Sequence, residues 1–170
     1  MDRKTSRSMT TGRKAAPLNP RRRGSTLRGM SARALKVFLS YAQSDGSWAR
    51  ELSGHLEAAG FRVLDPVGQL LPGDNWSLEI GKALDSSQAM VVLISPAAVR
   101  SPWVQREIQF ALGSEKYQDR LIPVEVEPTT DFPWVLRHLP WIKGNPSQAG
   151  QQVAEILEAA GEPDVHADAH

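Results

Sequence analysis

A tryptophan and a carboxylate stand four residues apart, at Trp103 and Glu107, in the stretch SPWVQREI (101–108). Helical positions i and i+4 lie on one face, so the indole and the acid should point the same way, into water or into a shared cleft. A carboxylate in a cleft can supply fixed negative charge and accept hydrogen bonds from hydroxyl groups. The alternative is an exposed carboxylate paired with Arg106 or Arg100.

Four more polar residues follow predicted strands. Ser40, Tyr41 and Gln43 come at the end of the apolar run KVFLSY (36–41) or just after it, and Asp65 ends the run FRVLD (61–65). The chain lacks a phosphate-cradling glycine-rich loop and a nucleophile elbow. The four histidines show no metal-ligand spacing, so we expect no metal site; they are His55, His138, His166 and His170.

Short apolar runs alternate with helical periodicity along the chain. The predicted strands are 36–41, 61–65, 89–95 and 121–126. The predicted helices are 44–60, 75–87, 103–117 and 147–160. We expect the proline- and glycine-containing stretch 66–75 to be a loop, and 127–144 to be an irregular Pro-rich segment.

The run AMVVLIS (89–95) is apolar throughout, which is typical of a parallel strand covered on both faces. We therefore predict an α/β fold: a flavodoxin-like five-stranded parallel sheet in the order 2-1-3-4-5, with helices on both faces. Ligands of such sheets bind beyond the C-terminal ends of the strands. The loops expected there are 41–46, 65–75 and 95–102.

Charge divides the chain into two parts. Residues 1–36 hold eleven of the twenty Lys and Arg and one acid, a net charge of +10, whereas the other 134 residues carry −9. We predict a basic disordered tail over 1–34, a folded domain over 35–160 and a disordered tail over 161–170. The basic tail could contact nucleic acid or anionic surfaces, or act as a transit peptide. A solvated extension, or a start at Met30, is favoured because no aromatic residue is interleaved for base stacking.

Composition limits the chemistry and the cellular compartment that can be expected of the protein. The chain has no cysteine, which excludes disulfides, thiolate metal sites and a cysteine nucleophile and fits a reducing compartment. No apolar run approaches the roughly 20 residues of a membrane span, and the N-terminus lacks a secretory signal. We expect a cytoplasmic protein without a membrane partner.

Four motifs together carry a resemblance to a known family. They are KVFLSYAQSD, GFRVLDPVGQLLPGDNW, VVLISPAAVRSPWVQREIQFAL and RLIPVEVE. In this order and spacing they resemble the TIR (Toll/interleukin-1 receptor) domain family, and its bacterial members most, over about residues 35–160. The family fold is the flavodoxin-like sheet already expected from periodicity.

The resemblance implies two functions. Some TIR domains cleave NAD+ between nicotinamide and ribose, and their essential glutamate sits four residues after an aromatic, where Glu107 follows Trp103. Others are interaction modules that assemble through the loop after the second strand, here 65–75. We expect the enzyme, with NAD+ as substrate, no cofactor and activation by self-assembly in bacterial immunity or virulence; the alternative is a non-catalytic scaffold.

The resemblance also implies substrate contacts at Trp103, Ser40, Tyr41, Gln43 and Asp65, with Glu107 as the catalytic carboxylate. Two departures from the family pattern bear on these contacts. Many enzymatic members carry Arg or Lys just after the Ser-Tyr pair, where this chain has Ala42 and Gln43, and Asp65 stands one position earlier than the usual acid. A receiver-like module is the weakest alternative, because the acids that it needs at the ends of its first and third strands are missing.

Overall fold

The computed structural model describes residues 34–161. Apart from residues 34 and 161, the two predicted tails lie outside the described residues, as do His166 and His170.

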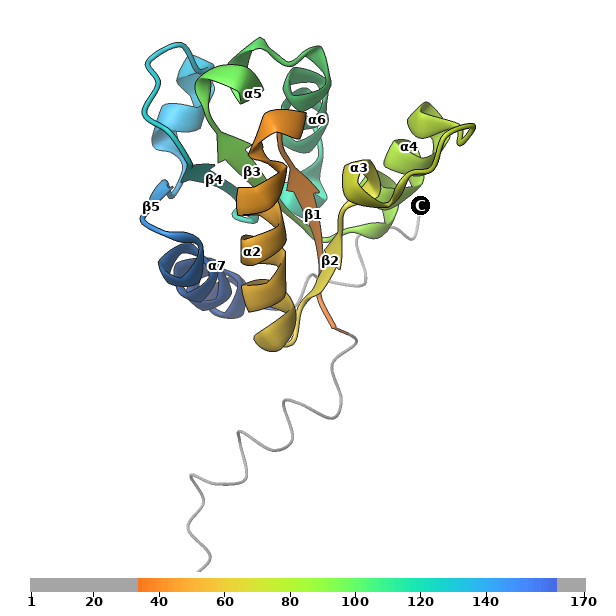
Figure 1. Cartoon of the computed structure of the whole chain (residues 1–170). Coiled ribbons are helices and arrows are strands. Elements are labelled where there is room, and N and C mark those ends of the chain that lie inside the picture. Colours follow the sequence, from red (N-terminus) through yellow and green to blue (C-terminus); the bar gives the residue numbers. More distant parts are fainter. Residues whose placement is uncertain (1–33, 162–170) are drawn as a thin grey trace, which may run out of the picture. The chain divides into compact units, whose positions relative to one another are not determined.

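Five parallel strands form one sheet in the order β2-β1-β3-β4-β5 (Figure 1). This is the predicted order 2-1-3-4-5, and the predicted α/β fold is confirmed. The strands are β1 (Lys36–Ser40), β2 (Arg62–Leu64), β3 (Ala89–Ile94), β4 (Leu121–Glu125) and β5 (Ile142–Lys143).

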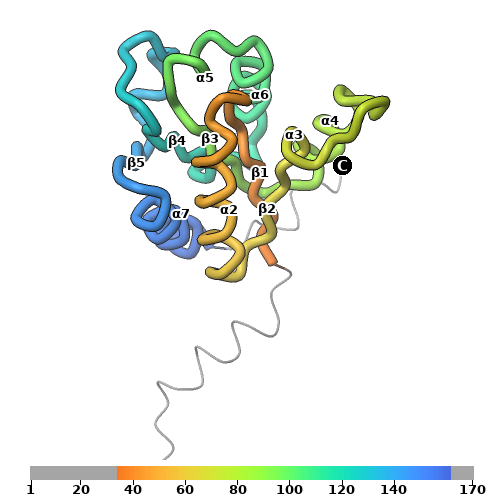
Figure 2. Tube along the Cα trace, viewed as in Figure 1, coloured from red at the N-terminus to blue at the C-terminus, as the bar shows by residue number. Residues whose placement is uncertain are grey.

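Helices connect the strands and cover both faces of the sheet. The α-helices are α2 (Gly46–Ala58), α3 (Pro66–Gln69), α4 (Trp76–Ser86), α5 (Pro96–Arg100), α6 (Pro102–Leu112) and α7 (Pro146–Ala160). Three short 3₁₀ turns complete the described elements: η2 (Gln43–Asp45), η3 (Glu115–Tyr117) and η4 (Trp134–His138). Figure 2 shows α7 lying beside α2.

Alternate residues of the central strands supply two separate cores. All six residues of β3 are buried. Val91 and Leu93 pack with α2 and α7, whereas Met90 and Val92 pack with α4, α5 and α6. Successive side chains of a strand point to opposite faces, so a strand covered on both sides must be apolar throughout. This is why the run at 89–95 could be placed at the centre of the sheet.

Four boundaries differ from the predictions. The stretch 66–75 is not wholly a loop, because the Asp65 side chain accepts a hydrogen bond from the Gly68 N–H and Pro66 stands at the first helical position, which starts α3. In the same way, Ser95 and Pro96 start α5 inside the expected loop 95–102. The helix predicted to reach residue 117 ends at Leu112, and the Pro-rich segment 127–144 contains η4 and β5.

A helix that crosses a lipid bilayer needs about 20 predominantly apolar residues. Among the described residues, none of the helices is both long and apolar enough to span it.

Candidate functional site

Two polar side chains meet in the interior at the C-terminal end of β1. Ser40 ends that strand, and its hydroxyl donates a hydrogen bond to Glu107 Oε2 on α6. Both residues are buried, with Ser40 1% and Glu107 3% exposed. A carboxylate this buried is uncommon, because removing it from water costs free energy unless it is paired or protonated.

The start of α6 explains how an acid enters the core. The Ser101 side chain accepts from the Val104 N–H, and Pro102 occupies the first helical turn. The buried face then runs through Val104, Ile108 and Ala111, and Glu107 falls on that face three residues after Val104. The acid is therefore part of the core-facing stripe of an otherwise ordinary amphipathic helix.

Burial changes the acidity of this group. The pKa of Glu107 is raised from 4.5 to about 7, and desolvation is the main cause. The hydrogen bond from Ser40 lowers the pKa, and the charge of Asp65 raises it. Among the described residues, Glu107 forms no ion pair. These properties contradict the exposed, arginine-paired carboxylate that we considered from the sequence.

A second hydroxyl–carboxylate pair joins the ends of β1 and β2. The Tyr41 hydroxyl lies 2.9 Å from Asp65 Oδ1 and 3.0 Å from Oδ2, and Oδ1 also accepts from the Gly68 N–H. Burial, followed by the hydrogen bond to Asp65, raises the pKa of Tyr41 above its usual range. Tyr41 is thus held as a neutral donor to a carboxylate that also caps α3.

The other two predicted substrate contacts lie at more exposed positions. Trp103 is 42% exposed, and the Arg106 guanidinium carbon sits 5.4 Å from the centre of its ring. Gln43 is exposed at the first position of η2. The structure therefore brings Ser40, Tyr41, Asp65 and Glu107 together, whereas Trp103 shares the helix of Glu107 but not its burial.

Sequence reasoning missed one further pair at this edge. Ser95, the residue after β3, donates a hydrogen bond to Asp45 Oδ2 at 2.5 Å and accepts one from the Ala98 N–H at 3.1 Å. Figure 1 shows the arrowheads of β1 and β3 pointing toward the end of the sheet where α5 lies. The Ser-Pro pair after an apolar run is a signal for a helix start and could have singled out Ser95. Its partner Asp45 lies 50 residues away in the sequence, and no local pattern indicates the pair.

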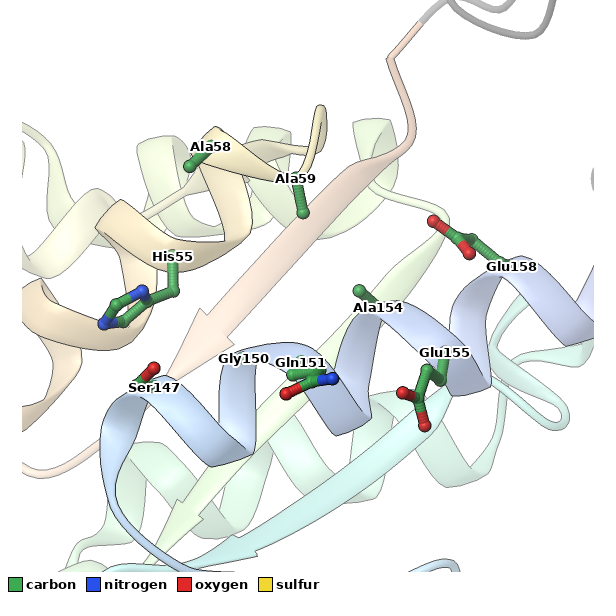
Figure 3. Close-up of a pocket in the computed structure, with 9 residues that line it drawn as sticks. All are labelled: His55, Ala58, Ala59, Ser147, Gly150, Gln151, Ala154, Glu155 and Glu158. Carbon is green, nitrogen blue, oxygen red and sulfur yellow. The ribbon is translucent and has the colours of Figure 1, made fainter. Parts of the chain in front are cut away.

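A shallow groove of about 470 Å³ lies elsewhere, between α2 and α7 (Figure 3). His55, Ala58 and Ala59 line it at the C-terminal end of α2, opposite Ser147, Gln151, Glu155 and other residues of α7. None of the predicted substrate contacts lines this groove. In the described part of the chain, no group of three or more His, Cys, Asp or Glu side chains is arranged to hold a metal ion.

The arrangement at the C-terminal edge defines the chemistry that it can perform. A carboxylate in a low-dielectric environment interacts strongly with a positive charge that forms beside it. Because the pKa of Glu107 is about 7, the group changes charge near neutral pH. The site is therefore suited to stabilising a positive charge that develops in a bound molecule, rather than to binding an anion beside the Glu107 carboxylate.

Comparisons with known proteins agree with this fold. A family model described as the TIR domain matches residues 37–160. An NAD(+) hydrolase of Actinoplanes sp., ApTIR, is 35% identical over 109 residues, which are 58% of this chain and 14% of that protein. The stimulator of interferon genes protein of Magallana gigas is 31% identical over 91 residues, 52% of this chain and 22% of that protein.

A solved metazoan TIR-STING receptor from C. gigas, in complex with 2′,3′-cGAMP, superposes with a TM-score of 0.60. It is 27% identical, and the match covers 75% of this chain and 39% of that structure. The chain thus spans less than a quarter of the two curated relatives and about two fifths of the receptor structure.

Proposed function

Because the chain belongs to the TIR domain family, we propose that it is an NAD+ nucleosidase that cleaves the bond between nicotinamide and ribose. One observation carries the proposal: Glu107 is buried at the C-terminal end of β1, bonded to Ser40, with a pKa of about 7. Ligands of such sheets bind at that edge. The similarity to an NAD(+) hydrolase supports it, although that relative is a much longer protein.

The reaction breaks the bond between C1′ of the ribose and the ring nitrogen of nicotinamide. The electron pair of that bond leaves with the nicotinamide, whose positively charged ring becomes neutral, so the leaving group needs no proton. Positive charge develops on the ribose, as in glycoside hydrolysis. The Glu107 carboxylate stabilises this charge and accepts hydrogen bonds from the ribose hydroxyls. Water then adds to C1′ and releases a proton, which gives ADP-ribose.

The remaining residues position the substrate in this proposal. Ser40 orients the Glu107 carboxylate, and Tyr41 and Asp65 fix the ends of β1 and β2 beside it. Gln43 and Trp103 lie at the exposed margin, where Gln43 contacts ribose or phosphate and the indole packs against the nicotinamide or the ribose and excludes water. An adenine nitrogen in place of water would give a cyclic product.

We further propose that the segment 65–75 mediates self-association. Leu71 in this segment is 67% exposed, and Trp76 and Leu78 at the start of α4 are exposed as well. Large apolar side chains that are exposed in and beside one loop favour an interaction surface. The same observation favours the second candidate function, a scaffold that signals by assembly without catalysis.

The test is to incubate the full-length protein with NAD+ at increasing protein concentration and to measure nicotinamide and ADP-ribose. We expect release by the wild type and at least about a 100-fold loss in Glu107→Gln, which keeps the size and removes the charge. Glu57→Gln, on an exposed position of α2, is the matched control and should retain activity. No release by the assembled wild type would leave the scaffold function instead.

A further inference from the structure

The proposed substrate poses an electrostatic problem at this site. The pyrophosphate of NAD+ is anionic, yet the edge that would bind it carries the carboxylates of Asp45 and Asp65, and that of Glu107 is buried there. Ala42 and Gln43, which follow the Ser-Tyr pair, carry no charge. If the proposed function is correct, the cation that binds the pyrophosphate must come from another position.

Arg50 lies close to this edge. It is one helical turn into α2, and its Nη1 atom is 3.8 Å from the point where a Cβ on Gly46 would lie. The Tyr41 ring carbon Cε2 is 4.0 Å from the same point. The guanidinium and the phenol ring therefore both approach Gly46, at the start of α2.

The charge of Arg50 reaches the groups of the candidate site. Burial and Asp65 together raise the pKa of Tyr41, and the positive charge of Arg50 opposes them. The charge of Glu107 acts on the same hydroxyl. Arg50 is thus a cation whose charge acts on the same hydroxyl as the charges of Asp65 and Glu107.

The guanidinium is also available to a ligand. The Arg50 side chain is exposed, and within residues 34–161 it forms no ion pair. By contrast, the Arg106 guanidinium already stacks on the Trp103 ring. Guanidinium groups suit pyrophosphate because they can donate two parallel hydrogen bonds to one phosphate.

We infer that Arg50 binds the pyrophosphate of the dinucleotide and replaces the basic residue that this chain lacks at positions 42 and 43. Arg50 would reach the ligand from α2 rather than from the loop after β1. The adjoining Tyr41 and Asp65 keep that loop in place, and Glu107 remains free to act on the ribose.

The test measures binding of ADP-ribose, which contains the pyrophosphate but no scissile nicotinamide bond, to the full-length protein by isothermal titration calorimetry. We expect Arg50→Gln to weaken binding about tenfold, and Arg50→Lys to stay within about threefold of the wild type. Arg62→Gln is the matched control, because Arg62 is exposed at the opposite end of β2 and its loss changes the net charge equally.

Kinetics with NAD+ supply the second readout. The pyrophosphate keeps its charge during the reaction, so loss of its partner should raise KM about tenfold and leave kcat within about twofold. Equal affinity of wild type and Arg50→Gln for ADP-ribose, equal losses in the Gln and Lys variants, or no binding by the wild type would each overturn the inference. If the wild type binds ADP-ribose through Arg50 but releases no nicotinamide, the proposed function fails and the inference stands.

Discussion

Replacing Glu107 by glutamine should stabilise the protein, and the gain should depend on pH. The pKa of Glu107 is raised by burial from 4.5 to about 7, so folding favours the protonated acid. The stability that the protonated acid contributes is fully present below pH about 4.5 and is lost as the pH rises through about 7. At higher pH the folded protein must keep a buried negative charge, which a glutamine avoids.

The magnitude follows from the two pKa values. Each pH unit between them corresponds to about 1.4 kcal/mol. Between pH about 4 and about 8, the free energy of unfolding of Glu107→Gln should therefore rise by about 3 kcal/mol relative to that of the wild type. Glutamine has nearly the same shape and its carbonyl can still accept from Ser40, so the difference isolates the charge.

Urea denaturation of both proteins across this pH range is the suitable assay, because the difference between the two curves removes the titration of all other groups. Glu57→Gln, an exposed helical glutamate, serves as the control and should show a nearly constant difference from the wild type. A Glu107→Gln difference that stays flat from pH about 4 to about 8, or that falls, would refute the account of Glu107 as a buried, unpaired acid.

Three further changes test the packing and the electrostatics of the domain. Gly54→Ala should stabilise the protein by about 1 kcal/mol in urea denaturation, because Gly54 is an exposed position inside α2 with nothing within 4 Å of the added methyl. Gly150→Ala should destabilise it by about 1–3 kcal/mol in the same assay, since the new Cβ would lie 2.7 Å from the His55 Cβ and force α2 and α7 apart; an unchanged midpoint would contradict this close approach. Ser40→Ala should move the titration of Glu107, followed by NMR of its side-chain carboxyl, to higher pH, because the lost hydrogen bond favours the ionised form; a shift to lower pH would contradict the assigned donor.

The layers of the fold could be predicted because burial leaves a periodic pattern of apolar residues in the sequence. The run at 89–95 is apolar at every position and forms β3, and Leu52 and Leu56 lie on the buried face of α2 as their spacing indicates. The fifth strand could not be placed, because β5 contains only two residues and follows a proline-rich segment. A strand that short has no alternation to detect.

Four of the residues singled out in the sequence lie together, namely Ser40, Tyr41, Asp65 and Glu107, but their contacts could not be predicted. Ser40 and Glu107 are 67 residues apart in sequence, and no local pattern indicates that a serine at the end of one strand donates to an acid on a later helix. The i, i+4 spacing correctly placed Trp103 and Glu107 on one helix, but it could not distinguish the exposed first turn from the buried second turn. Asp45 precedes α2 like an ordinary N-cap, yet its side chain bonds to Ser95 instead.

The pH dependence of kcat/KM for nicotinamide release from NAD+ tests the central claim most directly, because kcat/KM reports the ionisation of the free enzyme. If the ionised Glu107 carboxylate stabilises the developing cation, kcat/KM of the wild type should rise about tenfold per pH unit below the pKa of about 7 and level off above it. Glu107→Gln should lack this rise and remain at a low, flat rate. A flat profile in the wild type, or the same rising profile in Glu107→Gln, would contradict the assignment of Glu107 as the catalytic carboxylate.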